Sequence, residues 1–188
     1  MGKSTCADLL RARAVPVVDT DDLARQLVLP GQPALDEIRR AFGDEVLEST
    51  GQLRREFLAE RVFSDAAARQ QLEAILHPRI RALWLAQASD WRQQGKPLVV
   101  VVIPLLFETS AQAEFDATIC VACSPASQRQ RLLARGWTIT QLEQRISAQW
   151  PIDRKISAAD FVVWTEGPLS LAGEQLDRIL PNVLQLAH

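Results

Sequence analysis

The chain has 188 residues, 47% of them hydrophobic and 23% charged, which suits one compact domain or a core with a small inserted subdomain. The formal net charge of −2 offers no basic surface to nucleic acid or to an anionic membrane, so neither is expected as a partner. The longest apolar run, residues 97–107, is too short to cross a bilayer, and Lys3 is followed by polar residues rather than by a signal peptide. We therefore expect an intracellular, cytoplasmic protein, while no pattern in the sequence sets its oligomeric state.

Helical patterns alternate with short apolar runs along the chain, which predicts an α/β protein with a parallel sheet flanked by helices. Helices are predicted at residues 4–13, 21–29, 33–42, 124–135, 140–149 and 169–186, and strands at 15–19, 98–104, 116–123 and 160–164. The run from Leu98 to Pro104 is continuously apolar, so we expect a central strand that is covered on both faces.

Several helix boundaries can be predicted from single residues. Residues 55–94 are mostly helical in pattern, but Pro78 should break or kink this stretch and leave His77 non-helical. Ser124 is the predicted N-cap of the helix that follows it. Thr140 and Glu143 have the spacing of a capping box.

Three cysteines form an odd set, and two of them, Cys120 and Cys123, have the C-x-x-C spacing of a redox pair or half a zinc site. They lie in an apolar run, however, and no second pair follows. Burial in a strand is therefore the favoured interpretation, and thiols of this kind fit a reducing cytoplasm.

Gly2, Lys3, Ser4 and Thr5 open the first predicted helix and match the second half of a phosphate-binding loop, G-x-x-x-x-G-K-[ST]. Glycine lets phosphate approach the backbone, helix N–H groups complete an anion site, lysine neutralises phosphoryl charge, and the hydroxyl binds Mg²⁺. Lysine is otherwise rare, since only Lys96 and Lys155 follow. The alternative for so short a motif is a flexible polar terminus.

Asp19, Asp21 and Asp22 stand where the next predicted strand ends. Carboxylates at the C-terminal end of a parallel strand face the crevice in which α/β proteins bind ligands. There they can accept a proton from an attacking hydroxyl or hold the water shell of a metal. We interpret Asp19 and Asp21 as functional and Asp22 as the N-cap of the following helix.

With these motifs in order, the chain resembles the dephospho-CoA kinase family of P-loop kinases over essentially its whole length. The Asp-x-Asp, His-Pro and Pro-Leu-Leu-Phe-Glu motifs together are far more specific than the phosphate loop alone. The matching segments are 2–5, 18–25, 30–33, 53–55, 61–63, 76–78 with Ile80, 103–108, Arg131 with Arg135, 148–149 and 159–162.

The resemblance implies a P-loop NTPase fold in three parts, with ATP and dephospho-CoA as substrates and Mg²⁺ as cofactor. A nucleotide-binding core would comprise residues of about 1–30 and 96–188, a helical region for the acceptor about 31–95, and a small lid about 134–155. The implied reaction is phosphorylation of the ribose 3′-hydroxyl of dephospho-CoA, the last step of CoA biosynthesis.

The resemblance also implies roles for single residues. Asp21 would be the catalytic base, with Asp19 supporting it or the metal at the acceptor side. Gly2, Lys3, Ser4 and Thr5 would bind ATP, with Lys3 also catalytic and Ser4 a ligand of Mg²⁺. Arg135 would stabilise the transferred charge, since an arginine fork suits phosphate. His77, Leu105 and Glu108 would bind the acceptor.

For some of these residues a structural role is an equal or stronger interpretation. His77 could equally be a residue at a helix break, Leu105 and Leu106 could be ordinary core residues, and Arg131 could be a solvated helix arginine. Trp164 and Thr165 stand close to where the family pattern leads us to expect asparagine and an adenine contact.

A complete P-loop kinase has a strand and further glycines ahead of Gly2. We therefore expect additional chain upstream, with Met1 in the variable position directly before Gly2. Without that strand, neighbouring strands would have unpaired backbone groups in the middle of the sheet. The rival hypotheses are another small-molecule P-loop kinase and a non-catalytic product that binds CoA-like ligands.

Overall fold

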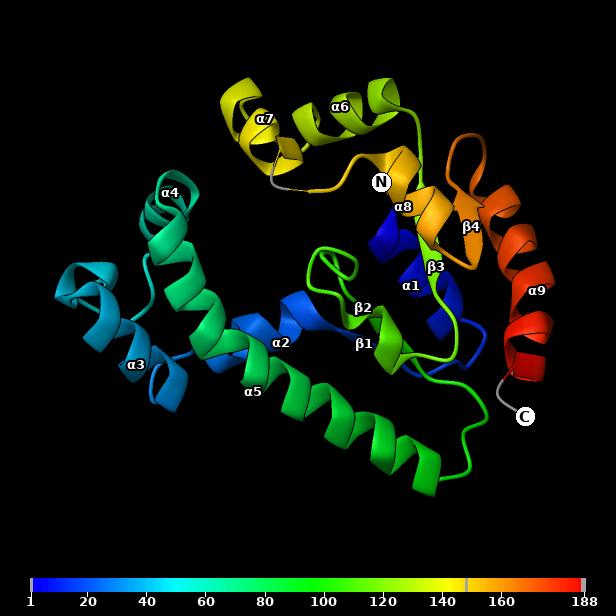
Figure 1. Ribbon diagram of the computed structural model, residues 1–188, viewed down its shortest axis with the longest axis horizontal. Helices are drawn as coiled ribbons and strands as arrows, with labels where there is room; N and C mark the ends of the chain where they lie inside the picture. The colour runs from blue at the N-terminus through cyan, green and yellow to red at the C-terminus, as the bar shows by residue number, and fades with distance from the viewer. Residues whose placement is uncertain (1, 148, 187–188) are drawn as a thin grey trace. The chain divides into compact units, whose positions relative to one another are not determined.

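The structure is a computed structural model that describes residues 2–147 and 149–186, apart from the side chain of Arg145. Met1, expected directly before the Gly2 motif, and Ala148, in the matching segment 148–149, lie outside the described residues. The chain divides into two compact units (Figure 1). The first comprises residues 1–17 and 96–188, and the second residues 18–95.

Parallel strands organise the first unit. β3 (Ile119–Ala122) and β4 (Phe161–Trp164) pair in parallel, with Ile119 opposite Phe161 and Ala122 opposite Trp164. The Asp160 carboxylate fixes this register, because it accepts hydrogen bonds from the backbone N–H and the hydroxyl of Thr118, at 2.7 and 2.8 Å. The parallel arrangement predicted from the alternating pattern is confirmed.

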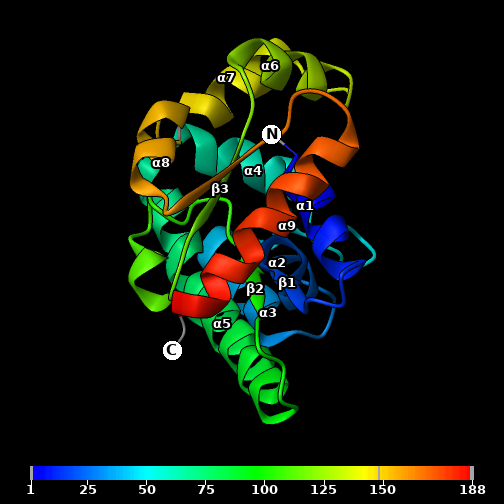
Figure 2. The same cartoon turned by 90° about the vertical axis from the view of Figure 1, so that its right-hand side faces the viewer.

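The first unit also contains helices, which are drawn in Figures 1 and 2. They are α1 (Lys3–Arg11), α6 (Pro125–Leu133), α7 (Ile139–Ser147), α8 (Ile152–Ala158) and α9 (Leu169–Leu186), with a 3₁₀ turn, η2 (Ala111–Glu114). Helix α9 packs on β4 and α1 through an apolar stripe that includes the almost fully buried Leu176. The same core contains Leu10 and Val163, so burial of these side chains holds α1 in place.

The strand predicted at residues 98–104 is shorter and more open than expected. β2 is Val100–Val102, and all three residues are only partly buried. The prediction of complete cover on both faces is therefore wrong. The physical reason is an apolar pocket that these residues line, described below.

Helices that pack their apolar residues around one long helix form the second unit (Figure 1). Its elements are the end of β1 (Val17–Asp19), α2 (Thr20–Leu27), α3 (Pro33–Phe42), η1 (Asp44–Val46), α4 (Arg55–Ser64) and α5 (Ala66–Gln93). Ile38 and Val46 are completely buried, and α2, α3 and α4 all contact α5. The unit therefore has a hydrophobic core of its own.

Helix α5 continues through Pro78, so of the predicted break or kink the break is wrong. The prediction that His77 is non-helical is also wrong, because His77 is helical. Proline removes one helical hydrogen bond and displaces the preceding turn. In this turn the Arg79 guanidinium donates to the Ile75 carbonyl at 2.6 Å and to the Glu37 carboxylate at 2.6 Å. These side-chain bonds, with packing against α3, keep the helix continuous.

Two predicted caps are displaced by a few residues. Asp19, not Asp22, is the N-cap of α2, and Asp22 instead bonds to Arg25 within the helix. The capping box of α7 is formed by Thr138 and Gln141, whose side chains accept from each other's backbone N–H groups. Thr138 precedes the helix directly, whereas Thr140 is already inside it. The predicted Ser124 N-cap of α6 is confirmed.

No helix within residues 2–147 and 149–186 is both long and apolar enough to cross a membrane.

Candidate active site

The predicted site residues are distributed over both units. Asp19, Asp21 and His77 belong to the second unit, at the start of α2 and in the middle of α5. The first unit contains all the others, which are Gly2, Lys3, Ser4, Thr5, Leu105, Glu108 and Arg135.

Gly2 directly precedes α1 and has a left-handed backbone, with φ 91° and ψ 11°. Its carbonyl accepts the N–H of Cys6 at 3.0 Å, so it begins the helical ladder. Lys3, Ser4 and Thr5 then form the first turn, where backbone N–H groups have no helical partner and carry partial positive charge. The four residues therefore form a helix N-terminus suited to phosphate, with a lysine and two hydroxyls beside it.

Replacing Gly2 by alanine should lower the free energy of unfolding by about 1–2 kcal/mol, because an L-residue is strained in the left-handed region. A Cβ at Gly2 would also lie 3.1 Å from Cγ2 of Thr165. Gly31→Ala is the matched control, since Gly31 has φ 86° and open space around its Cβ position. Urea unfolding should show a larger loss of unfolding free energy for Gly2→Ala than for Gly31→Ala. Equal losses would contradict the expected steric contact of the new Cβ with Thr165.

The two candidate carboxylates on α2 have different surroundings. The half-buried Asp19 caps α2, and its carboxylate accepts the backbone N–H of Asp21 at 2.9 Å. Asp21 is exposed in the first turn of the helix. Asp19 thus holds the backbone from which the Asp21 side chain extends.

Three further predicted site residues lie on different elements of the chain. His77 is exposed on α5, in the second unit. Leu105 is half-buried in the turns that follow β2, in the first unit. Arg135 is exposed just after α6.

Glu108 is part of a buried ion pair that the sequence did not indicate. Its Oε1 atom lies 2.8 Å from Nζ of Lys155 and also accepts the backbone N–H of Trp150 at 2.8 Å. Only 13% of the Glu108 side chain and 7% of the Lys155 side chain are exposed. Burial raises the pKa of Glu108, but the hydrogen bonds from Lys155 and Trp150 outweigh it and hold the pKa below its usual value.

Hydrogen bonds hold the loop after β4 close to Gly2. Arg131, on α6, donates to the Thr165 hydroxyl at 2.9 Å and to the Thr165 carbonyl at 2.6 Å. The Thr165 hydroxyl also bonds to the Ala122 carbonyl at 3.0 Å. Arg131 is thus a bonded, half-buried residue and not a solvated arginine, and it supports the threonine that a Cβ at Gly2 would meet.

Glu166 fastens the same loop to the start of α6. Its Oε1 atom accepts the backbone N–H of Ser124 at 2.9 Å and the hydroxyl of Ser127 at 2.6 Å. The indole N–H of Trp164 lies 3.3 Å from the other oxygen. Hydrogen bonds from Ser124 and Ser127 lower the pKa of Glu166 to about 2.

The pKa of Glu166 is lower in the folded chain than in the unfolded chain. Its carboxylate therefore stabilises the fold above about pH 4.3, the ordinary pKa of glutamate, and this stabilisation is lost as the pH falls toward 2. We expect Glu166→Gln to flatten the acid side of the stability curve, so that wild type and variant converge near pH 2. Chemical unfolding between pH 2 and 7 measures this. Glu174→Gln, at an exposed position on α9, is the control, and a parallel offset at all pH values for Glu166→Gln would contradict the role assigned to its charge.

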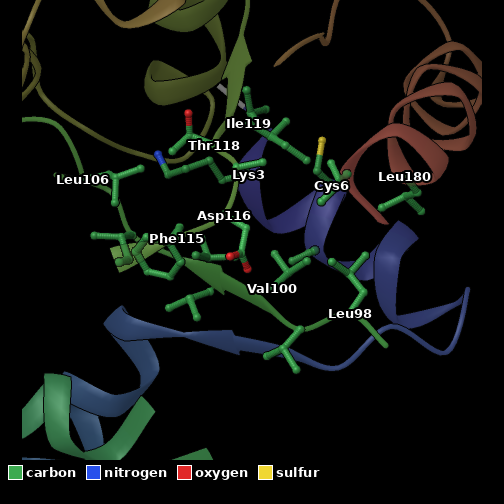
Figure 3. Close-up of a pocket in the computed structure, with 18 residues that line it drawn as sticks. Lys3, Cys6, Leu98, Val100, Leu106, Phe115, Asp116, Thr118, Ile119 and Leu180 are labelled. Atoms are coloured by element: carbon green, nitrogen blue, oxygen red, sulfur yellow. The ribbon is translucent and has the colours of Figure 1, made fainter. Parts of the chain in front are cut away.

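A pocket of about 180 Å³ lies beside α1 (Figure 3). Its walls are mostly apolar and include residues 98–103 on one side and 117–119 with Val121 on the other. β2 and β3 belong to separate two-stranded sheets and are not hydrogen-bonded neighbours. Lys3 and Asp116 are the charged residues of the lining.

All three cysteines are free, buried thiols. The predicted burial of Cys120 and Cys123 is confirmed, although only Cys120 lies within the strand. Burial raises the pKa of Cys120, whereas the nearby positive charges of Lys155 and Lys3 lower it. Cys120 is therefore within electrostatic reach of both lysines. Within the described part of the chain, no three His, Cys, Asp or Glu side chains gather into a metal site.

Sequence reasoning missed Lys155 and Glu166. The scarcity of lysine was a signal for Lys155, because it is one of three in the chain. Glu166 gave no signal, because its partners are about 40 residues away in the sequence.

Parallel strands flanked by helices, with a Gly-Lys-Ser-Thr motif at a helix N-terminus, are the features of a P-loop nucleotide-binding kinase. The dephospho-CoA kinase family model matches residues 1–170. The chain belongs to the dephospho-CoA kinase family and is an ATP-dependent kinase.

Similar proteins cover almost the whole chain. A dephospho-CoA kinase of Anaeromyxobacter dehalogenans is 47% identical over 184 residues, which are 97% of this chain and 87% of that protein. One of Bdellovibrio bacteriovorus is 38% identical and covers 100% of this chain and 93% of its own length.

Solved structures share the fold. A Thermus thermophilus protein has a TM-score of 0.83 at 34% identity, covering 96% of this chain and 91% of that one. Dephospho-CoA kinase from Campylobacter jejuni has a TM-score of 0.68 at 22% identity, covering 100% and 94%, and supports the fold alone. The predicted P-loop NTPase fold is therefore confirmed.

Proposed function

We propose that this chain transfers the γ-phosphoryl group of ATP to the ribose 3′-hydroxyl of dephospho-CoA, giving CoA and ADP. The observation that carries the proposal is 47% identity to a dephospho-CoA kinase over 97% of the chain. The free, buried cysteines fit work in a reducing cytoplasm.

The residues at the start of α1 would hold the phosphates of ATP. Backbone N–H groups of the first turn would bind phosphate oxygens, and the Lys3 ammonium would neutralise charge on the γ-phosphoryl group. Gly2 would let the backbone approach the phosphates closely, and Thr5 would add a hydroxyl.

Ser4 is exposed in the first turn of α1, which supports the proposal that its hydroxyl would bind a metal that ATP phosphates also bind. Mg²⁺ commonly takes one or two protein ligands together with phosphate oxygens and waters, which fits a single hydroxyl. When bound, Mg²⁺ would neutralise charge on the β- and γ-phosphates.

Asp21 would accept the proton of the acceptor hydroxyl. A bond forms between the 3′-oxygen and the γ-phosphorus, and the bond from that phosphorus to the β–γ bridging oxygen breaks, so ADP leaves. Asp21 suits the role better than Asp19 because Asp21 is exposed, whereas Asp19 caps α2 and orients the backbone of Asp21.

The remaining predicted residues would bind the acceptor and stabilise the charge of the transferred phosphoryl group. Arg135 would pair with the transferred phosphoryl group through its guanidinium fork. His77, in the region of about residues 31–95 that the resemblance assigns to the acceptor, would contribute to binding of dephospho-CoA. Leu105 and Glu108, which lie outside that region, would contribute as well. The segment of about residues 134–155 would act as a lid.

The test is CoA formation from dephospho-CoA and ATP, followed by chromatography, with Mg²⁺ and with EDTA in its place. We expect CoA only when Mg²⁺ is present, and a panel of nucleosides and nucleotides should not replace dephospho-CoA. Phosphorylation of another acceptor instead would favour a different P-loop kinase. Thermal stabilisation by CoA without any stabilisation by Mg-ATP would favour a non-catalytic binder.

A further inference from the structure

The buried ion pair of the first unit links two segments that are far apart in the sequence. Glu108 belongs to the turns after β2, whereas Lys155 lies on α8 and Trp150 just precedes that helix. Besides Glu108, the Lys155 ammonium reaches the side chain of Gln149 at 3.3 Å and the carbonyl of Pro104 at 3.5 Å. One buried cation therefore connects both ends of the 104–108 turn with the 149–155 segment.

An aromatic contact reinforces the same connection. The rings of Phe107 and Trp150 stack with centroids 6.0 Å apart and an interplanar angle of 15°. The Arg154 guanidinium lies 3.3 Å from the centroid of the Trp150 ring. The turn after β2 and the chain before α8 are thus held by charge, by a backbone hydrogen bond and by ring stacking at one place.

Stability alone is a weak explanation for this pair. The free energy lost when two charges leave water offsets much of their mutual attraction. Proteins with apolar side chains of similar volume in place of such a pair are often as stable. The pair is also incompletely satisfied, because Oε2 of Glu108 is buried and has no hydrogen-bond partner within the described residues. A charged pair of this kind fixes one arrangement of the two segments, which a set of apolar side chains does less strictly.

The position of the pair connects it with the proposed chemistry. Helix α8, which carries Lys155, packs against β3, and Ile119 and Val121 of β3 line the same pocket as Lys3, the lysine proposed to face the phosphates. Gln149 and Trp150 lie in the C-terminal part of the predicted lid, and the 104–108 turn contains two predicted acceptor residues, Leu105 and Glu108 itself.

We propose that Glu108 and Lys155 are positioning residues that hold the C-terminal end of the predicted lid against the turn after β2, and so set the active geometry for phosphoryl transfer. This rests on the proposed function. Lys155 acts through Glu108 and Gln149, and its role does not require contact with a substrate.

The test compares Glu108→Gln, Lys155→Met and the double variant with wild type. Each single variant leaves one buried charge without its partner, so melting temperature and kcat both fall, with kcat reduced about 10²-fold as for a small displacement of catalytic groups. The double variant removes both charges and should recover most of the melting temperature while kcat stays low. Asp8→Asn, which breaks the exposed pair of Asp8 and Arg11, is the control and should change neither quantity.

The double variant separates positioning from simple support of the fold. If its kcat returns with its melting temperature, the pair only stabilises the fold and the proposal is wrong. If all folded variants keep kcat within about twofold of wild type, a change too small for lost positioning, the proposal is also wrong.

A second measurement does not depend on CoA formation. It tests the inference even if the proposed function is wrong. Trypsin can cut after Arg154, an exposed residue of α8. Glu108→Gln leaves the sequence at that bond unchanged and should speed its cleavage about tenfold, because local opening becomes easier. Equal cleavage rates in wild type and Glu108→Gln would overturn the proposal even if wild type makes no CoA.

Discussion

Replacing Asp21 by asparagine should lower kcat for CoA formation by about 10²–10⁴-fold, the usual contribution of a general base. Asparagine has nearly the same shape and preserves the start of α2, but its amide cannot take the proton of the 3′-hydroxyl. The KM for ATP should change little, since Asp21 is proposed to act on the acceptor. Steady-state kinetics with both substrates varied measures the effect.

Asp22→Asn is a matched control for this variant, because Asp22 is the neighbouring exposed carboxylate and pairs with Arg25 on the helix surface. Its activity should stay within about twofold of wild type, as exposed pairs contribute little. Asp19→Asn should lower kcat less than Asp21→Asn does if Asp19 only orients the backbone of α2. Normal turnover in Asp21→Asn, or a larger loss in Asp19→Asn, would remove the assignment of the base.

Replacing Lys3 by methionine should lower kcat by about 10²–10³-fold, as for the loss of one group that stabilises developing charge. Methionine keeps the length and apolar body of the side chain, so α1 should still form. The KM for ATP should rise as well, because the ammonium is proposed to contact phosphate in the ground state too. Kinetics together with binding of Mg-ATP by calorimetry separate the two effects.

Lys96→Met is the corresponding control, since Lys96 is an exposed lysine outside the helices and strands. It should bind Mg-ATP and turn over as wild type does. If Lys3→Met behaves like Lys96→Met, the helix N-terminus is not the phosphate site and the assignment of Gly2, Ser4 and Thr5 fails with it. If Lys3→Met raised only the KM for dephospho-CoA, Lys3 would instead act at the acceptor.

Local features of the fold were predictable because their causes are local. The period of apolar residues predicted α9 at residues 169–186, and serine followed by proline predicted the start of α6. Boundaries were less certain where two caps compete within a few residues. Thr138 with Gln141 caps α7 in place of Thr140 with Glu143, because only the former pair lies at the helix start.

Tertiary contacts overruled a strong local rule at Pro78. Proline in a helix interior usually breaks it, yet α5 runs from Ala66 to Gln93. Arg79 supplies hydrogen bonds to the turn and to Glu37 of α3, and sequence alone does not show that α3 lies alongside. The half-buried state of β2 was unpredictable for the same reason, since it depends on the neighbours of a strand and not on its own residues.

By itself the sequence determined the alternation of helices and parallel strands, the helix N-terminus at Gly2–Thr5 and the likeness to one kinase family. These features depend on residues that are neighbours in the chain, so their causes are visible in the sequence. Only the tertiary structure decided that Glu108 meets Lys155 and that Arg131 holds Thr165. The partners of these bonds are tens of residues apart, and burial, which gives the bonds their strength, exists only in the folded chain.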